Sequence, residues 1–258
     1  MKTILICHDG AQLDHVVLTH WLGSFSDLVG LVVVHEPVTR LWRRIRREVG
    51  RTGILRFLDV LAFRAYYSAF VAVGDRRWLH DEIARLRLDS ETVPSLPVLN
   101  TPSPNSVEAR SFIEELQPDV ILARCKTLLK EDVFSIPKLG TFVMHPGICP
   151  EYRNAHGCFW ALANRDLDRV GMTLLRIDRG IDTGPVFGYY SCPFDEARES
   201  HIVIQQRMVL ENLDTLRDKF IEIFNGTAKP LSVEGRSSAS WGQPWLTKFI
   251  SWKYRARM

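Results

Sequence analysis

The stretch FVMHPGICPEYRNAHGCFW, residues 142–160, begins like a buried strand and then changes character. Its apolar residues end at His145, and Pro146 and Gly147 interrupt the strand pattern. A tyrosine, an arginine, an asparagine and a second histidine follow in the same loop. Ligands of open α/β sheets bind outside the carboxyl ends of strands. The stretch therefore indicates a strand that delivers polar side chains to a candidate site.

Apolar runs elsewhere in the chain predict more strands of the same kind. They cover residues 2–7, 28–34 and 118–125, and segments with helical periodicity separate them. Uninterrupted Val, Leu and Ile runs that alternate with helices indicate parallel strands with both faces covered. We predict an α/β fold with a Rossmann-like, mostly parallel sheet, a long helix over residues 199–226 and an irregular tail from residue 227.

Composition describes an ordinary globular chain. Its 258 residues are 46% hydrophobic and 24% charged, enough to bury a full core without metal or disulfide support. The five cysteines form no CxxC pair, so we expect neither a disulfide framework nor a metal site. The chain contains no uninterrupted apolar run of about 18 residues, and its first apolar run is short for a signal peptide. We expect a cytoplasmic protein.

Positive charge is concentrated in one segment. Residues 40–64 carry eight arginines and two acidic residues, interleaved with apolar and aromatic side chains. The commonest outcome for such a pattern is an amphipathic helix packed on its own sheet. Residues 39–64 also suit peripheral contact with an anionic membrane or a lipid-linked substrate. Capture of nucleic acid through phosphates is the least favoured of the three.

The residues from His145 onward form a long ordered pattern with a known parallel. The pattern resembles the formyltransferases that use 10-formyltetrahydrofolate, over about residues 1–10 and 95–190. The residues that match the family are His145, Gly147, Pro150, Tyr152, Arg153, Trp160, Gly171, Thr173, Asp182 and Gly184. The resemblance implies the formyltransferase fold and transfer of a formyl group to a small amine, such as an amino sugar or an amino-acid derivative.

The resemblance also implies a division of the chain. We expect a catalytic domain over residues 1–195, with a basic helical insertion at about residues 39–90. We expect residues 196–258 to form a helix and tail that pack on the same domain. Only about 70 residues follow Asp182, which is short for a second β domain and disfavours an initiator-tRNA substrate.

By resemblance, His145 and Asp182 are the catalytic residues. Formyl transfer needs a base for the amine, a donor for the tetrahedral oxyanion and a proton for the leaving nitrogen. The residues expected to hold the folate donor are Ala123, Arg124, Cys125, Lys126, Leu128, Gly147 and Ile148. The residues expected around the acceptor are His8, Asp9, Gly10, Tyr152, Arg153, Asn154 and His156.

Three positions depart from the family pattern. Val143 replaces the catalytic asparagine, Leu175 replaces a second histidine, and Asn154 replaces a glycine. Asp9 would repel a phosphate in the first loop, which disfavours glycinamide ribonucleotide. Three alternatives remain open: an oxyanion donor supplied from elsewhere, a related one-carbon or acyl transferase or hydrolase, and a non-catalytic binding protein. The candidates for such a donor are His8, Lys126, Asn154 and His156.

Overall fold

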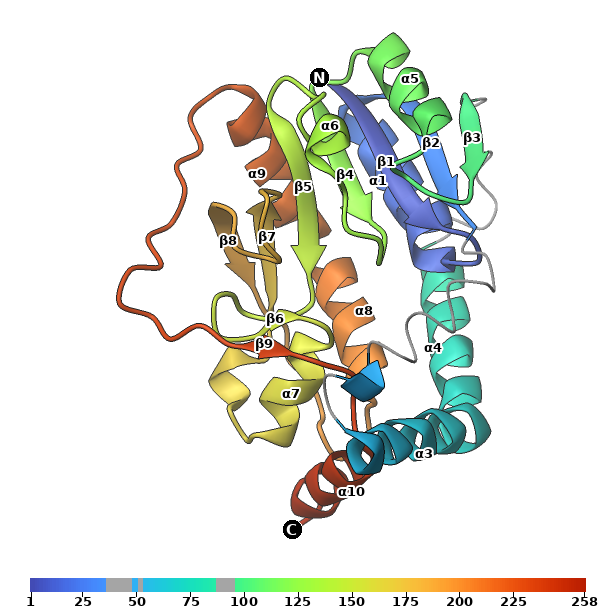
Figure 1. Cartoon of the computed structure of the whole chain (residues 1–258), viewed down its shortest axis with the longest axis vertical. Helices are drawn as coiled ribbons and strands as arrows, with labels where there is room; N and C mark the ends of the chain where they lie inside the picture. The colour runs from blue at the N-terminus through green and yellow to red at the C-terminus, as the bar shows by residue number, and fades with distance from the viewer. Residues whose placement is uncertain (36–47, 51–52, 87–95) are drawn as a thin grey trace.

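The computed structural model describes residues 1–35, 48–50, 53–86 and 96–258, and one seven-stranded sheet organises them (Figure 1). The strand order is β3-β2-β1-β4-β5-β7-β8. The strands are β1 Lys2–His8, β2 Asp27–Val34, β3 Val98–Thr101, β4 Val120–Arg124, β5 Gly140–His145, β7 Met172–Arg176 and β8 Val186–Tyr190. The first five strands in this order, β3, β2, β1, β4 and β5, are parallel. Strands β7 and β8 are joined to the sheet by antiparallel pairing at one edge. The predicted mostly parallel Rossmann-like sheet is confirmed.

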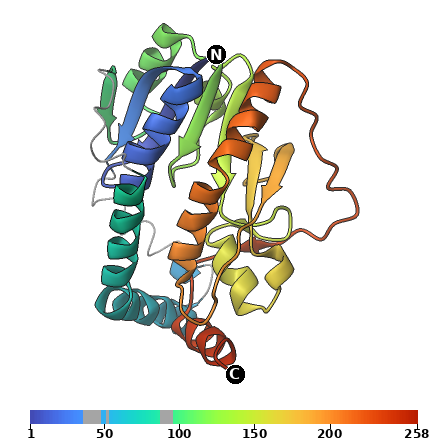
Figure 2. The same cartoon turned by 180° about the vertical axis from the view of Figure 1, so that it is seen from behind.

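Helices cover both faces of the sheet, as Figures 1 and 2 show from opposite sides. On one face Leu5 and Cys7 of β1 join a core that includes the first helical segment and the helices near the C-terminus. On the other face Ile4 and Ile6 pack with Ile113. Alternate residues of β1 therefore fill both cores, which explains its uninterrupted apolar sequence. The helical segments before β5 and beside these cores are η1 Leu13–Leu18, α1 Thr19–Phe25, α5 Val107–Leu116 and α6 Glu131–Phe134.

The C-terminal region is more regular than the sequence predicted. The single long helix is two helices, α8 His201–Glu211 and α9 Leu213–Phe224, separated at Asn212. The Asn212 amide donates to the carbonyl oxygens of Met208 (2.8 Å) and Ser191 (3.0 Å). Asparagine side chains compete for backbone groups in this way, which weakens a helix interior.

The predicted irregular tail also needs correction. It contains the short strand β9 Ser240–Trp241 and the helix α10 Leu246–Arg255. Strand β9 pairs with β6 Arg153–Asn154 in the loop that follows β5. Phe249 and Trp252 of α10 are buried. Long-range pairing and burial therefore impose regular structure on a segment whose local sequence does not require it.

Two helices occupy the described part of the predicted basic insertion. They are α3 Ile54–Phe70 and α4 Ala72–Arg85, and α3 lies beside α10 at one end of the molecule (Figure 1). Among the described residues, no single helix is long and apolar enough to cross a bilayer. Helices α3 and α4 pass that test of length and composition only as a pair, bent by 55°. Six of the eight arginines in the basic segment lie outside the described residues.

Candidate functional site

The end of β5 carries a close pair of ionisable side chains. His145 Nδ1 lies 3.3 Å from Asp182 Oδ2, and His145 Nε2 donates a 2.8 Å hydrogen bond to the carbonyl oxygen of Tyr152. A carbonyl can only accept, so Nε2 carries a proton, and Nδ1 also faces an acceptor. The His145 ring thus lies between the Asp182 carboxylate and the Tyr152 carbonyl oxygen. The structure thus brings together the two residues expected to be catalytic, and their roles stay a prediction.

Two loops hold Asp182 in place. The Asp182 residue has a left-handed backbone (φ 51°), and its Oδ2 accepts a 2.7 Å hydrogen bond from the backbone N–H of Asn154. Arg153 donates to the carbonyl oxygen of Ile181 at 2.9 Å. The loop after β5 and the loop between β7 and β8 are therefore tied together around the carboxylate.

Close backbone approach explains Gly147 in this loop. A Cβ on Gly147 would lie 2.5 Å from the carbonyl oxygen of Tyr152 and 2.8 Å from Cα of Gly157, the first residue of α7 Gly157–Ala163. No larger residue fits without moving the backbone. Asn154 stands where the family has glycine and adopts φ 75°. Asparagine is one of the few residues that tolerate this region, so the departure preserves the backbone path.

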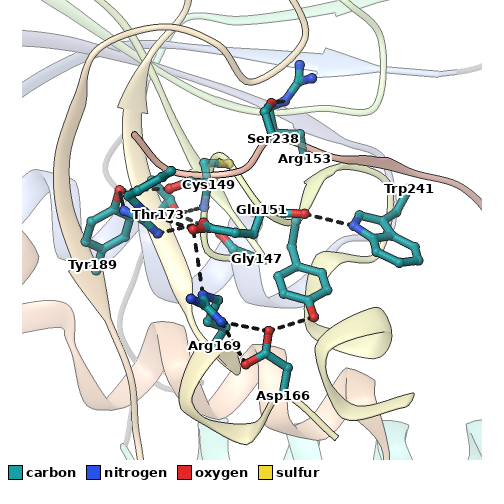
Figure 3. Close-up of polar contacts among 12 residues, drawn as sticks. Gly147, Cys149, Glu151, Arg153, Asp166, Arg169, Thr173, Tyr189, Ser238 and Trp241 are labelled. Carbon is teal, nitrogen blue, oxygen red and sulfur yellow. Dashed lines mark hydrogen bonds and ion pairs between the residues drawn. The ribbon is translucent and has the colours of Figure 1, made fainter. Parts of the chain in front are cut away.

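Polar contacts fix the remainder of the loop, as Figure 3 shows. Thr173 Oγ1 donates to the carbonyl oxygen of Gly147 (2.6 Å) and accepts from the N–H of Cys149 (3.0 Å). The Tyr152 hydroxyl donates to Asp166 at 2.9 Å, beside the 3-10 turn η2 Leu167–Arg169. Tyr152 is buried, so its side chain shapes the loop.

The C-terminal tail closes over this loop from outside. Trp241 stacks between Tyr152 (ring centroids 5.6 Å apart) and Trp160 (4.9 Å). Its indole N–H donates to the carbonyl oxygen of Glu151 at 2.9 Å, and Arg236 binds the Glu151 carboxylate through two nitrogens. Sequence analysis missed these tail contacts. The partners are 85 to 90 residues apart, and no local pattern marks them.

The two apolar departures from the family pattern face each other. Val143 of β5 is the cross-strand partner of Leu175 of β7. Both pack in a small apolar cluster with Cys149, Val186 and Tyr189. The positions of the missing asparagine and the missing histidine therefore lie in one mainly apolar cluster.

The end of β4 shows how the predicted donor-site residues lie. Arg124 forms a 3.0 Å ion pair with Asp14 and donates to the carbonyl oxygen of Met144 at 3.1 Å. Ala123 is buried in the sheet, and the Cys125 thiol donates to the carbonyl oxygen of Thr127. Leu128, by contrast, exposes 63% of its surface. Leu128 is thus exposed, whereas the end of β4 is held in place by the ion pair between Arg124 and Asp14.

On the opposite side of the β5 site, Ile148 is buried, and a Cβ on Gly171 would lie 2.4 Å from its Cδ1. Gly147 and Ile148 therefore form a compact turn between β5 and the start of β7.

At the end of β1, His8 links three strands. Its Nε2 accepts from the backbone N–H of Lys126 at 2.8 Å, and its Nδ1 lies 3.4 Å from the carbonyl oxygen of Val34. Both ring nitrogens of His8 are thus engaged by backbone groups. Asp9 pairs with His35 at 3.0 Å, next to Gly10 at φ 74°.

A hollow of about 350 Å³ lies at this end of β1, lined by His8, Asp9, Val34, His35 and Lys126. The hydrogen bond that His35 donates to Asn100 Oδ1 and the charge of Asp9 raise the pKa of His35. Sequence analysis did not single out His35, although it ends an apolar run as His8 and His145 do.

A second cavity, of about 290 Å³, collects His156, Lys126 and the helical residues Arg64 and His201. Burial, followed by the positive charges of Lys126 and Arg64, lowers the pKa of His156 to about 4. His156 is therefore neutral near pH 7. Among the described residues, neither hollow is lined by His145 or Asp182. The structure thus separates a closed ion pair from two open cavities.

The pattern of the sheet and the paired residues agrees with known proteins. Residues 83–216 match the family model described as formyl transferase. The chain is 30% identical over 135 residues to methionyl-tRNA formyltransferase of Thermotoga maritima, covering 50% of this chain and 43% of that protein. It is 32% identical over 102 residues to the bifunctional polymyxin resistance protein ArnA of Wigglesworthia glossinidia brevipalpis, covering 39% and 15%.

Solved structures share the fold at low sequence identity. A sugar N-formyltransferase from Shewanella sp FDAARGOS_354 superposes with a TM-score of 0.56 and 14% identity, covering 99% of this chain and 88% of that one. Phosphoribosylglycinamide formyltransferase from Anaplasma phagocytophilum gives 0.55 and 12%, covering 95% and 99%.

A matched segment that spans more than half of the sequence defines the class. The chain belongs to the formyl transferase family. It spans less than half the length of the methionyl-tRNA formyltransferase that it matches.

Proposed function

We propose that the protein transfers a formyl group from 10-formyltetrahydrofolate to the amine of a small acceptor, such as an amino sugar or an amino-acid derivative. The observation that carries the proposal is the contact between His145 and Asp182 at the end of β5 in a member of this family. Carboxylate and imidazole together supply the acid and base that the reaction needs.

The geometry assigns different tasks to the two residues. Both ring nitrogens of His145 face protein acceptors, and its side chain is only 4% exposed. The Asp182 side chain is 17% exposed, so it is the member of the pair that a ligand can reach. We assign proton removal from the attacking amine to Asp182. His145 holds that carboxylate in position.

The donor would lie between the end of β4 and the loop before β8. Both segments expose an apolar side chain, Leu128 (63%) and Ile181 (38%), which suits the faces of a flat pterin. A bidentate ion pair between Arg179 and Glu131, at 2.7 and 2.9 Å, bridges the same two segments. When bound, the donor supplies the formyl group. The chain's own residues orient the donor and remove the amine's proton.

Binding followed by turnover tests this proposal. Calorimetry with 5-formyltetrahydrofolate should show binding, and mass spectrometry with 10-formyltetrahydrofolate and a panel of amines should show formylated product. A folded protein that binds neither folate contradicts the proposal. The Shewanella relative is a sugar N-formyltransferase, so amino sugars lead the panel.

One observation favours a second candidate, a non-catalytic binding protein. The opposed Val143 and Leu175 place apolar side chains where the family pattern has an asparagine and a histidine. Loss of one oxyanion donor typically lowers the rate about 10²–10³-fold. Folate binding without any product, over the whole amine panel, would favour this candidate over transfer.

We also propose that residues 196–258 belong to the same domain as residues 1–195. The indole N–H of Trp21 donates to the carbonyl oxygen of Leu213 at 2.9 Å, and Phe220 packs against Phe142 of β5. Limited proteolysis should therefore release no stable fragment that ends near residue 195.

We further propose that the α3 end of the molecule meets an anionic membrane surface. Ile54, Leu55, Leu58 and Leu61 lie along one side of α3 and are 40% to 81% exposed, while Phe57 and other residues of the opposite side are buried. Ile250 and Tyr254 add exposed apolar surface on the adjacent α10. Helix α3 thus has a buried apolar side that packs in the protein and an exposed apolar side with arginines nearby. Such a helix suits the boundary between lipid headgroups and acyl chains.

A further inference from the structure

The cavity of about 290 Å³ lies where α3, the start of α8 and the segment before α10 meet. Its aromatic wall includes Phe63, Tyr67 and His201, whose ring is 5.8 Å from that of Phe63. Arg64 and Lys126 add two cationic side chains. The cavity thus combines an uncharged aromatic surface with positive charge.

One buried polar atom in this wall lacks a partner. His201 is 1% exposed, and within the described part of the chain its Nδ1 makes no hydrogen bond. Burial lowers the pKa of His201 well below its usual value, so the ring is neutral. A buried imidazole nitrogen without a partner destabilises a protein unless a bound molecule supplies one. A ligand hydroxyl or amide could do so.

The two cations are also uncompensated. Across the residues that the structure describes, no ion pair joins Arg64 or Lys126 to a carboxylate. The Arg64 guanidinium donates to an uncharged group, Gln243 Oε1, at 3.4 Å. After burial, the charges of Lys126 and Arg64 contribute to the lowered pKa of His156, so both cations act on the interior of the cavity. Their positive charge attracts anionic groups.

The other hollow is less suited to an anion. Lys126 lines both hollows, but the one at the end of β1 also contains the Asp9 carboxylate. Asp9 would repel a phosphate or carboxylate there. An anionic group entering this part of the molecule is therefore directed to the cavity beneath α3.

We propose that this cavity binds the acceptor substrate through an anionic group, a phosphate or a carboxylate, held by Arg64 and Lys126. An uncharged polar group of the same molecule forms a hydrogen bond with His201 Nδ1. This inference rests on the proposed function, and it narrows the acceptor to an amine that also carries an anionic group.

The cavity adjoins the catalytic pair through the backbone. His156 lines the cavity and precedes Gly157, and a Cβ on Gly157 would lie 2.7 Å from Cα of Gly147. A Cβ on Gly147 would in turn lie 3.1 Å from His145 Nε2. The loop residue His156 of the cavity and the strand-end residue His145 therefore belong to backbone segments that touch at Gly147 and Gly157.

Equilibrium binding without folate tests the proposal. Isothermal titration with glucosamine 6-phosphate should show binding, and glucosamine should bind at least tenfold more weakly. Inorganic phosphate or acetate should compete, and whichever competes better identifies the anionic group. Arg64→Gln and Lys126→Gln should each weaken glucosamine 6-phosphate binding at least tenfold. Arg77→Gln, which removes an exposed arginine from neighbouring α4, should leave it unchanged.

The variant His201→Phe distinguishes a histidine that binds the ligand from one that only packs in the core. The change keeps a ring of similar size and removes the unpartnered nitrogen, so it should raise Tm while it weakens glucosamine 6-phosphate binding. A purely structural histidine would lower Tm when replaced.

Equal binding of glucosamine and its phosphate, or unchanged affinity in both glutamine variants, overturns the proposal. So does a lack of competition by both phosphate and acetate. Titration of 5-formyltetrahydrofolate into the same samples keeps the two proposals apart. Loss of folate binding with intact phosphate-dependent binding contradicts formyl transfer, and the reverse result contradicts only the anionic cavity.

Discussion

The ion pair at the end of β5 and the cavity beneath α3 are neighbouring regions built in opposite ways. At the ion pair, Asp182 and both nitrogens of His145 have protein partners. In the cavity, among the described residues, one imidazole nitrogen lacks a hydrogen-bond partner and two cations lack a carboxylate partner. The first region is organised by the protein itself, whereas the second needs a ligand to complete it.

The family match covers one region fully and the other in part. Residues 83–216 include His145 and Asp182, and they also include Lys126 and His201 of the cavity. Arg64 and Gln243, also in the cavity lining, lie outside that segment. Four predictions can break or sharpen this contrast.

The largest effect should follow from the ion pair. His145→Ala and Asp182→Asn should each lower formyl transfer by about 10²–10⁴, the usual scale for acid and base groups. Because His145 acts through Asp182, the double variant should be little slower than Asp182→Asn alone. Single-turnover rates measure the effect, with Tm and folate binding as controls for folding. Near-normal turnover in either single variant would remove the pair from the mechanism.

The second effect concerns the arginine-rich segment next to α3. Sedimentation with vesicles that contain anionic lipid should show salt-sensitive binding, and neutral vesicles should bind poorly. Changing Arg43, Arg44, Arg46 and Arg47 to Gln should weaken it at least tenfold, since each cation near such a surface contributes about 1 kcal/mol.

Leu55→Ser with Leu58→Ser should weaken vesicle binding at every salt concentration, because apolar burial is not screened. If the wild-type protein does not bind anionic vesicles at low salt, the membrane proposal is wrong. The segment is then a packed helix with solvated arginines.

The third effect concerns the apolar wall beside the ion pair. Val143→Asn buries an amide opposite Leu175, and we expect a loss of about 1–3 kcal/mol in the free energy of unfolding. Formyl transfer should not rise, because Leu175 offers the amide no partner. Urea denaturation and initial rates measure the two outcomes. A tenfold faster variant would show that the missing amide alone limits the reaction.

The double change Val143→Asn with Leu175→His should recover part of the lost stability, because polar side chains on opposed strands can pair. If the double variant is as unstable as the sum of the single variants, the two positions do not act as one unit.

The smallest effect is a pH dependence of stability from the cavity histidines. Burial lowers the pKa of His156 to about 4 and that of His201 further, whereas the unfolded chain takes up protons near pH 6.5. Their contribution is present above pH 6.5 and is lost as pH falls toward 4.

His201→Phe should remove about 1–2 kcal/mol of the stability difference between pH 7 and pH 5. Urea denaturation at the two pH values measures it, with Arg77→Gln as a control. An unchanged difference would show that burial does not lower the pKa of His201 in the folded protein.

The sequence by itself determined the sheet and the location of the ion pair. Uninterrupted apolar runs such as residues 2–7 predict parallel strands because burial on both faces leaves no room for alternation. The residues from His145 to Asp182 follow a family order that is visible without coordinates. The turn at Gly147 is also evident from the local sequence, because glycine is suited to a place where two backbone segments come close together.

Only the tertiary structure decided the rest. The opposition of Val143 and Leu175 depends on strand register, and the cover of Trp241 on Tyr152 joins residues about 90 positions apart. The exposed and buried sides of α3 follow from what α10 covers. In the sequence, His201 is simply one residue of a predicted helix. Tertiary packing leaves its Nδ1 buried and without a partner in the described structure. Periodicity reports the local path of the chain, whereas these features depend on which distant segments come into contact.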